Sequence, residues 1–422
     1  MEKNKVIAIK TPESNTKDLL TEFLREKSRE MLMIAVDAEV SEFINSYKEN
    51  ILPDGKLAVV RNGYQPERKI QTGIGEIDIQ VPKTRDRSGT GVNFTSSLLP
   101  PYLRRTAQME ELIPWLYLKG VSTGEMQNAL ISLVGEDAKN LSPSVVSRLK
   151  AKWADEYDAW AGEDLSKKNY VYFWVDGVYF NVRGEDDKQC ILVIVGVRDD
   201  GVKEIVGFLD GFRESEASWI ELLQEIKSRG LKTAPKLAIG DGALGFWKAI
   251  TKIYPDTRHQ RCWLHKIRNI LDKLPDSAQK KAKSMLQEIW RAETKSDALK
   301  AFKVFIKRYT DKYPDAAKCL EKDKEQLLAF YDFPAVHWQH IRTTNPIESI
   351  FSTVKLRIGK TRGMLPRKSM LALVFKLTLC AQKNWRKLRG FRRLAEVIRG
   401  IKFTNGLTNE EIKELGEMKN AA

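Results

Sequence analysis

The sequence predicts an α/β core whose mixed sheet begins with three antiparallel strands, carries an all-α insertion and follows mainly helical N-terminal modules. The apolar and aromatic run at residues 170–180 indicates a buried strand. Two further apolar runs, 191–201 and 203–211, end in turn residues, and Asp200-Gly201 between them is a strong hairpin signal. Residues 276–333 are almost purely helical in pattern.

The N-terminal segment, residues 1–106, is predicted to hold a long helix and a small β unit that contacts DNA or a second subunit. The helix is expected over residues 17–49. Its uneven apolar face comprises Leu20, Phe23, Leu24, Met31, Ile34, Phe43 and Ile44. Alternation of Ile74, Ile77, Ile79 and Val81 with polar residues predicts short, half-exposed strands. Residues 84–106 are expected to be mostly loop.

Residues 107–165 are predicted to form three helices resembling a helix-turn-helix DNA-binding domain. Gly120 ends the first helix, Ser122 and Glu125 form a capping box for the second, and Pro143 occupies the first position of the third. The third helix would present Ser144, Ser147, Arg148 and Lys150 to DNA. A plain helical linker domain is the alternative.

The α/β core is expected to begin at residues 166–275. After the three strands, a helix is predicted at 215–230, then a short strand ending before Asp241, another helix, and a strand-helix pair at 256–274. The remaining divisions are a helical insertion at 276–340, a core-completing helix at 341–365 and a basic helical region at 366–422. Asn345 and Pro346 start the 341–365 helix, whose core face comprises Ile347, Ile350, Phe351 and Val354.

Charge in this 422-residue chain is concentrated near one end. The formal net charge is +15, and residues 343–402 carry 15 Lys and Arg against two acids, a local charge of +13. Such a segment favours a polyanionic partner, most simply nucleic acid, although a solvated helix face is the alternative. Four scattered cysteines, no signal-peptide core and no run long enough to span a membrane lead us to expect a cytoplasmic protein.

One acid stands inside the buried 170–180 strand. Desolvating an unpaired carboxylate costs several kcal/mol, so Asp176 requires either a basic partner or a metal ion. Asp241 and Glu348, 65 and a further 107 residues downstream, favour a metal. Strand, strand-edge and helix positions can converge at one sheet edge and hold divalent ions for phosphoryl transfer. With 56 acids in the chain, spacing alone is a weak signal.

Several motifs in order carry a family resemblance. They are VDGVYF around Asp176, AIGDGALGFWKAI around Asp241, HQRCWLHKIRNIL with the C-x-x-H of Cys262 and His265, and TTNPIESIFSTVKLR around Glu348. Residues 170–363 resemble the catalytic domain of the Mutator-type transposases of bacterial insertion sequences. RNGY at 61–64, the IGEIDIQVPKTRD that follows it, and GVSTGEM with LSPSVVSRL extend the resemblance over most of the chain.

The resemblance implies a ribonuclease-H-like fold with a helical insertion between the second Asp and the Glu. It also implies a DNA transposase that binds the terminal inverted repeats of an insertion sequence, nicks double-stranded DNA at the element ends and joins a 3′-hydroxyl to target DNA. Asp176, Asp241 and Glu348 would be the catalytic ligands of two Mg²⁺ ions, with Mn²⁺ as a substitute. Paired ends imply a homodimer or higher oligomer in the active complex.

The roles of the remaining His, Cys and Trp residues are less specific. Cys262 and His265 alone cannot make a structural zinc site and His259 is not well placed to help, so the favoured interpretation is that they pack beside the active site and orient it. His337 and His340 could contact DNA or pack, and the sequence does not choose. Trp247 and Trp263 are expected to be core residues rather than base-stacking ones.

A basic series begins on the helix of Glu348, beside the expected cutting site. Its members, proposed to bind DNA phosphates, are Lys355, Arg357, Lys360, Arg362, Arg367 and Lys368. Two rivals to an active transposase remain: a domesticated, non-catalytic DNA-binding protein, and a ribonuclease-H-like structure-specific nuclease. Intact acids argue against the first, and the N-terminal modules argue against the second.

Overall fold

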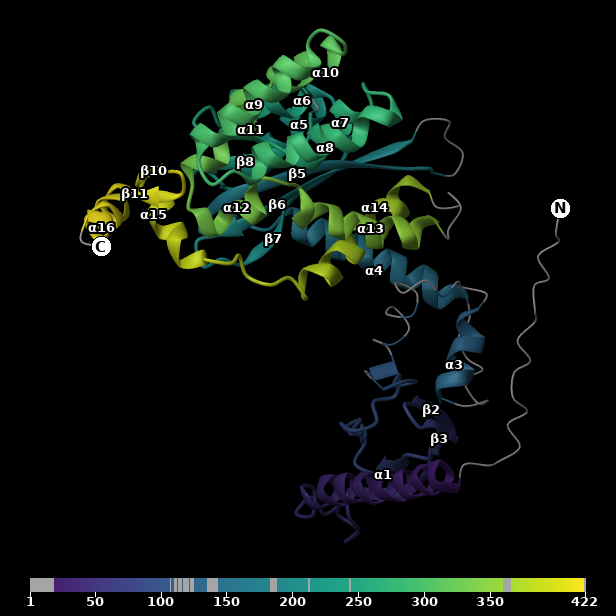
Figure 1. The fold of residues 1–422 in the computed structure, drawn as a ribbon. Coiled ribbons are helices and arrows are strands. Elements are labelled where there is room, and N and C mark those ends of the chain that lie inside the picture. Colours follow the sequence, from purple (N-terminus) through teal and green to yellow (C-terminus); the bar gives the residue numbers. More distant parts are fainter. Residues whose placement is uncertain are drawn as a thin grey trace, which may run out of the picture. The chain divides into compact units, whose positions relative to one another are not determined.

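The computed structural model describes residues 19–106, 108–109, 112, 116, 121, 125–134, 143–182, 188–211, 213–242, 244–359 and 366–420 (Figure 1). The chain divides into two compact units, Met1–Leu149 and Lys150–Ala422. The division falls inside helix α4, Pro143–Ala161, which begins at the predicted proline. The first helix predicted in 107–165 and the Ser122–Glu125 capping box lie largely outside the described residues, and helix α3 spans Met126–Val134.

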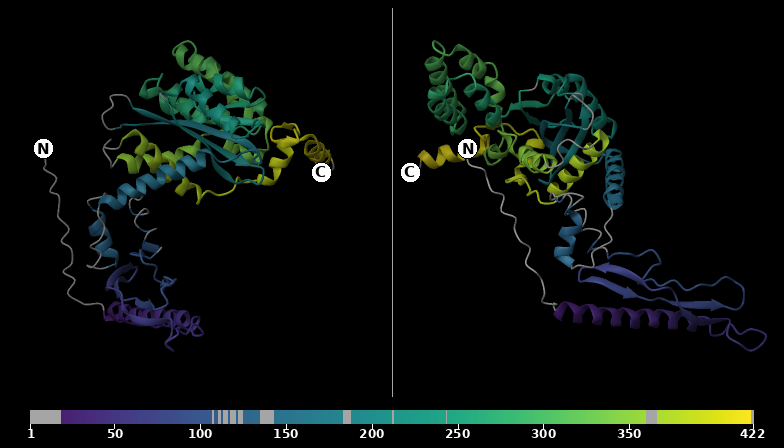
Figure 2. Two further views of the ribbon diagram at one scale, coloured as in Figure 1. Left: turned by 180° about the vertical axis from the view of Figure 1, so that it is seen from behind. Right: turned by 90° about the vertical axis from the view of Figure 1, so that its right-hand side faces the viewer.

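The first unit is built on helix α1 and two antiparallel strand pairs (Figure 2). Their bounds are α1 Leu19–Asn45, β1 Val59–Tyr64, β2 Arg68–Thr72, β3 Gly75–Ile79 and β4 Pro82–Asp86. Pairing joins β1 to β4 and β2 to β3. Val36 and Val40 of α1 pack with Ile70, Ile77 and Ile79 in one buried cluster, so the predicted helix and short strands are confirmed.

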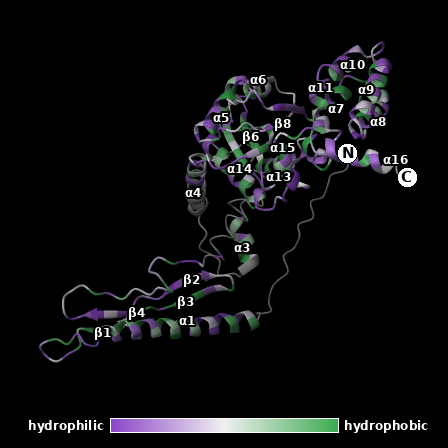
Figure 3. Cartoon of the chain, turned by 90° about the vertical axis from the view of Figure 1, so that its left-hand side faces the viewer, coloured by the Kyte–Doolittle hydropathy of each residue, from purple (hydrophilic) through white to green (hydrophobic). Residues whose placement is uncertain are grey.

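The buried face of helix α1 differs from the apolar face that the sequence predicts. Phe43 and Ile44 pack against the cluster, but Met31 and Ile34 are 71% and 70% exposed within the described structure. Leu20, Phe23 and Leu24 are exposed as well. Hydrophobic and hydrophilic residues alternate along the helix in Figure 3, so no single apolar stripe distinguishes its buried face.

The second unit contains a mixed five-stranded sheet in the order β7-β6-β5-β8-β9. The strands are β5 Tyr170–Phe180, β6 Gln189–Arg198, β7 Lys203–Gly211, β8 Leu237–Gly240 and β9 Arg258–Arg261. β5, β6 and β7 pair antiparallel, with the β6–β7 hairpin at the predicted Asp200-Gly201, whereas β8 lies parallel to both β5 and β9. The α/β class is therefore confirmed.

Helices cover both faces of this sheet (Figure 1). On one face lie α5 Glu216–Ser228 and α6 Leu244–Ile253, and on the other α13 Asn345–Gly359 and α14 Arg367–Gln382. Phe173 and Val175 of β5 pack with Trp219 of α5 and Phe246 of α6. On the opposite face, Phe375 of α14 contacts Phe208 of β7 edge-on. Tyr172, which precedes Phe173 in β5, instead contacts Phe333 and His337, as expected for side chains that alternate along a strand.

The second half of α4 belongs to the sheet's unit rather than to a free-standing helical domain. Tyr157 donates a hydrogen bond to the Phe208 carbonyl at 3.0 Å, and its ring contacts Phe375 edge-on at 5.2 Å. Lys376 of α14 forms an ion pair with Glu156. These contacts anchor residues of α4 after Lys150 to β7 and α14.

The helical insertion and the C-terminal region complete the second unit. After α7 Trp263–Leu271, the elements are α8 Asp276–Arg291, α9 Lys295–Tyr309, α10 Pro314–Glu321, α11 Lys324–Leu327, η1 Ala329–Asp332, η2 Ala335–His337, α12 Trp338–Ile341, η3 Phe391–Arg393, α15 Leu394–Ile398, β10 Phe403–Thr404, β11 Leu407–Thr408 and α16 Asn409–Asn420. The helical character predicted for 276–333 is confirmed. Among the described residues, no helix is both long and apolar enough to cross a membrane.

Candidate active site

Strand register brings two of the predicted acids level with each other. β5 and β8 pair in parallel with Trp174 opposite Ile239. Asp176 follows Trp174 by two residues, and Asp241 follows Ile239 by two residues. Neighbouring strands lie about 4.8 Å apart, so the two acids emerge side by side. Asp176 is fixed locally, because its Oδ1 accepts a hydrogen bond from the Gly177 N–H at 3.0 Å.

The loop that carries Asp241 is held through its backbone. The Asp241 carbonyl oxygen accepts hydrogen bonds from Arg261 Nη1 at 2.7 Å and from Trp247 Nε1 at 3.0 Å. Trp247 packs against the hydrophobic core of α5 and α6. Trp263 is fully buried and donates a hydrogen bond to the Leu327 carbonyl, so its prediction as a core residue is confirmed, whereas Trp247 is half-buried at the edge of the core.

A buried ion-pair network connects this loop to the helical insertion. Arg261 lies 3.2 Å from Asp323, which also pairs with Lys266 of α7. The side chains of Arg261, Asp323 and Lys266 are 11%, 14% and 4% exposed. Since Arg261 also holds the Asp241 carbonyl, the insertion supports the position of the second acid.

Glu348 lies in the first turn of α13, the helix whose predicted start at Asn345 is confirmed. α13 packs against β5, the strand of Asp176. Ile347, Phe351 and Val354 are buried, as predicted for its core face, whereas the side chain of Ile350 lies outside the described structure. The carboxylate of Glu348 accepts a hydrogen bond from the Thr344 hydroxyl at 2.7 Å.

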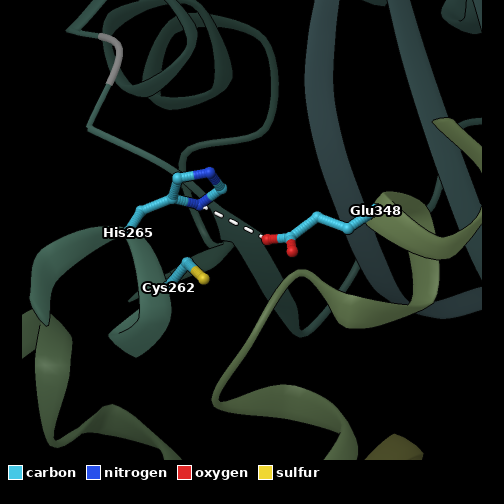
Figure 4. A group of neighbouring side chains, drawn as sticks. All are labelled: Cys262, His265 and Glu348. Atoms are coloured by element: carbon cyan, nitrogen blue, oxygen red, sulfur yellow. Dashed lines mark ion pairs between the residues drawn. The ribbon is translucent and has the colours of Figure 1, made fainter. Parts of the chain in front are cut away.

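Cys262 and His265 approach Glu348 from α7, as Figure 4 shows. His265 Nδ1 lies 3.6 Å from Glu348 Oε1 and 3.4 Å from the Thr344 hydroxyl. The Cys262 sulfur accepts a hydrogen bond from the Thr344 N–H at 3.3 Å, and the hydroxyl lies 3.2 Å from it. The Cys262 N–H donates to the Gly240 carbonyl, which joins this group to the end of β8. Thr344, which the sequence did not single out, therefore contacts all three side chains.

The same group has the geometry of a possible metal site. One ligand atom each from Cys262, His265 and Glu348 lie within 4.8 Å of one another. Sulfur and imidazole nitrogen are ligands typical of zinc rather than of Mg²⁺. His259 does not join them, because its ring contacts Trp247 at a centroid distance of 4.7 Å. Thr344 lies within hydrogen-bonding distance of Cys262, His265 and Glu348, so these three side chains already have a polar partner within the protein.

The carboxyl group of Asp176 is partly buried and lies near other acidic side chains. Burial and the neighbouring Asp241 raise the pKa of Asp176 to about 7, with a smaller contribution from Glu348. Glu214, an acid that no motif identified, behaves in the same way: burial, Asp241 and Asp176 raise its pKa to about 7. Hard carboxylate oxygens that repel one another fit a divalent cation such as Mg²⁺.

His265 supplies positive charge near these acids. A hydrogen bond with Cys262 raises the pKa of His265 to about 9, and Glu348 and Asp176 add to the effect. Burial alone would raise the pKa of the Cys262 thiol, but hydrogen bonds with His265 and Thr344 outweigh it and lower that pKa. At neutral pH, His265 is therefore a cation beside Glu348.

The other two histidines named by the sequence pack within the protein. His337 is fully buried, lies 2.9 Å from the Tyr172 hydroxyl and 3.0 Å from the Gly390 carbonyl, and burial lowers its pKa to about 4. Burial likewise lowers the pKa of His340 to about 4. Both are neutral at physiological pH.

The predicted DNA-contacting residues are described only in part. Lys355 and Lys368 are exposed, whereas Arg367 forms a two-point ion pair with Asp210 at 2.6 and 2.9 Å. The other predicted contacts lie outside the described side chains: Ser144, Ser147, Arg148, Lys150, Arg357, Lys360 and Arg362.

Asp176 inside β5, Asp241 just after β8 and Glu348 on a covering helix thus define an α/β protein with an acidic site at neighbouring strands of its sheet. The family model described as "Transposase, Mutator family" matches residues 1–388, and the chain belongs to that family of transposases.

Named relatives agree with this assignment. The transposase for insertion sequence element IST2 of Acidithiobacillus ferrooxidans is 49% identical over 67% of this chain and 95% of its own length. The transposase for element IS6120 of Mycolicibacterium smegmatis is 47% identical over 71% and 92%. The transposase for element IS905 of Lactococcus lactis is 30% identical over 90% and 95%.

Proposed function

We propose that this transposase acts through an Asp-Asp-Glu site on a ribonuclease-H-like core. It would bind the terminal inverted repeats of an insertion sequence, cleave strands at the element ends and join them to target DNA. The observation that carries the proposal is the level placement of Asp176 on β5 and Asp241 just beyond the paired strand β8, with Glu348 close enough to influence the pKa of Asp176.

Asp176, Asp241 and Glu348 are the proposed ligands of divalent ions, Mg²⁺ with Mn²⁺ as a substitute. Two such ions, when bound, lower the barrier to phosphoryl transfer by activating the attacking oxygen and stabilising the leaving one. The protein itself supplies oxygen ligands on rigid elements. The register of β5 and β8 and the backbone contacts of Arg261 and Trp247 keep two of them in place.

The role proposed for Cys262 and His265 is to position Glu348. Thr344 holds the carboxylate through its hydroxyl, and Cys262 holds Thr344 through its backbone N–H. His265, whose pKa is raised to about 9 by its hydrogen bond with Cys262, lies 3.6 Å from the carboxylate. These hydrogen bonds would hold the carboxylate of Glu348 in one orientation, as is usual for carboxylates that bind a metal ion.

Double-stranded DNA is the proposed partner, both as element ends and as target. The exposed Lys355 and Lys368 support this proposal, because they stand in the basic window 343–402, and Lys355 is on the helix of Glu348. End recognition is assigned to the N-terminal segments 1–106 and 107–165. Two ends must be handled together, so the active complex would contain at least two copies of the chain.

Replacing Asp241 with asparagine tests this proposal. Asp241→Asn should abolish strand cleavage but leave binding to the element's ends within a few fold, because it removes a metal ligand and little volume. Cleavage gels and mobility-shift titrations on the same DNA measure the two effects. Joint loss of folding and binding would instead make Asp241 a structural residue, and undiminished cleavage would exclude it from the site.

A further inference from the structure

Glu214 is a fourth acid at this site, and its carboxyl group lies directly against the residue that follows Asp176. That residue is Gly177. A Cβ atom added there would lie 2.5 Å from Glu214 Cδ and 2.7 Å from its Oε1. A side chain at position 177 would force the carboxyl group of Glu214 to move, so the glycine leaves room for this group against the backbone next to Asp176.

The backbone of Glu214 is held as closely as its side chain. A Cβ atom added at Gly245 of α6 would lie 2.4 Å from the Glu214 carbonyl oxygen, so α6 and this loop are in tight contact. The Glu214 N–H lies 3.4 Å from the Tyr179 hydroxyl of β5. The loop between β7 and α5 is therefore fixed against both α6 and β5.

Helix capping does not account for this acid. Ser215 is the N-cap of α5, and its hydroxyl accepts a hydrogen bond from the Ser218 N–H at 3.1 Å. Glu216 supplies the acid of the first turn and pairs with Lys252 at 2.6 Å. The helix end is thus capped without Glu214, whose carboxyl group interacts with the Tyr179 hydroxyl and electrostatically with Asp241 and Asp176.

We propose that Glu214 is a fourth carboxylate of the active site and contributes an oxygen, directly or through a water molecule, to the binding of a divalent cation held by Asp176 and Asp241. The inference rests on the proposed metal-dependent function of those two acids. Three neighbouring carboxylates repel one another, and partial burial strengthens this repulsion. A cation bound between them would stabilise their ionised forms by removing it.

The test is the affinity of the full chain for Mn²⁺, measured by isothermal titration calorimetry without DNA. Glu214→Gln should weaken binding about tenfold or more, the range typical of lost support at a metal site. Glu216→Gln is the matched control, because Glu216 lies two residues away at the start of the same helix and its half-buried carboxylate pairs with the exposed Lys252 and Lys248. The control should bind Mn²⁺ as the wild type does.

A second variant reaches the same carboxyl group from the other side. Gly177→Ala places a methyl group where Glu214 lies, so it should weaken Mn²⁺ binding to a similar extent. Adding Glu214→Ala relieves the clash. The double variant Gly177→Ala with Glu214→Ala should therefore regain the wild-type thermal unfolding midpoint in EDTA, but not the lost affinity for Mn²⁺.

Two results would overturn the inference, and they differ from failure of the proposed function. Wild-type Mn²⁺ affinity in Glu214→Gln, together with lost affinity in Asp176→Asn, removes Glu214 from the site and leaves the proposed function standing. Wild-type Mn²⁺ affinity in both variants would show that these acids do not bind the metal ion, which would contradict the proposed function as well. Recovery of affinity in the double variant would show that Gly177→Ala acted by distortion rather than by displacing the Glu214 carboxylate.

Discussion

Thr344 carries several contacts that fix the third acid. Its hydroxyl donates to Glu348 at 2.7 Å and lies near His265, while its backbone N–H donates to Cys262. It is fully buried, one residue before the start of α13. The rotamer of Glu348 therefore depends on a hydroxyl group that has no catalytic chemistry of its own.

Thr344→Val removes this hydroxyl while keeping the side chain's size. We predict that kcat for strand cleavage falls about tenfold to a hundredfold with little change in DNA affinity, because a hydrogen bond to a charged group is worth about 1.5–3 kcal/mol. Thr344→Ser, which keeps the hydroxyl, should retain most activity. Equal losses in both variants would assign the effect to packing of the methyl group.

The raised pKa of Asp176 predicts how stability varies with pH in the absence of metal. Asp176 titrates at about 7 in the folded protein against an ordinary value of 3.8, so between these values the folded state binds more protons than the unfolded state. Asp176 therefore stabilises the fold below pH 4, and this contribution is lost as pH rises toward 7. The loss is on the order of a few kcal/mol.

Thermal unfolding in EDTA from pH 4 to pH 8 measures this contribution. The midpoint of the wild type should fall relative to that of Asp176→Asn as pH rises, and Mg²⁺ should recover it at pH 7 to 8. Parallel pH profiles for the two proteins would contradict the account of Asp176.

The sequence predicts Asp176, Asp241 and Glu348 as the site's acids because each stands in a motif that resembles the family. It missed Glu214 and Thr344 for physical reasons. Glu214 precedes an ordinary N-cap serine and looks like a solvent-exposed helix-start acid, since only the close approach of Gly177 reveals its position. Thr344 is one of two adjacent threonines, and its role depends on contacts with residues about 80 positions away.

At the scale of elements, α7 and the helical insertion support the acidic site through the network of Arg261, Lys266 and Asp323. Lys266 is 4% exposed, so its ammonium group depends on Asp323 for neutralisation. Asp323 comes from the junction of α10 and α11, far along the chain from β9 and α7. Removing one partner of such a buried pair leaves an uncompensated charge.

Asp323→Asn should therefore destabilise the second unit by about 3 kcal/mol and reduce cleavage through Arg261, which also holds Asp241. Asp332→Asn is the control, because Asp332 pairs with the half-exposed Arg258 and should cost less than about 1 kcal/mol. Chemical denaturation monitored at tryptophan measures both. Equal effects of the two substitutions would contradict a special role for the buried network.

Elements were predicted best where one strong pattern dominates. The apolar runs of β5, β6 and β7, the Asp200-Gly201 turn and the start of α13 at Asn345 follow directly from local sequence. The buried face of α1 could not be predicted, because its apolar residues surround much of the helix and tertiary contacts choose Val36 and Val40. The attachment of α4 to β7 and α14 likewise depends on distant aromatic partners.

At the scale of the whole molecule, acidic and basic residues are concentrated in different parts of the chain. A few acids gather inside β5 and just after β7 and β8, whereas basic residues accumulate along residues 343–402. Within that window, Arg367 is already paired with Asp210, but Lys355 and Lys368 are exposed. The proposed metal-dependent DNA chemistry would need both an acidic cluster to bind cations and basic residues to bind phosphates.

The most direct test is strand cleavage and joining by the purified chain on the ends of its own element, with Mg²⁺ and with EDTA. The account predicts nicking and joining that require Mg²⁺ and disappear in Asp176→Asn, while binding to the ends persists. Tight binding to the ends without cleavage under any divalent metal would contradict it and indicate a non-catalytic DNA-binding protein. Cleavage of branched DNA or hybrids without preference for the element's ends would instead indicate a structure-specific nuclease.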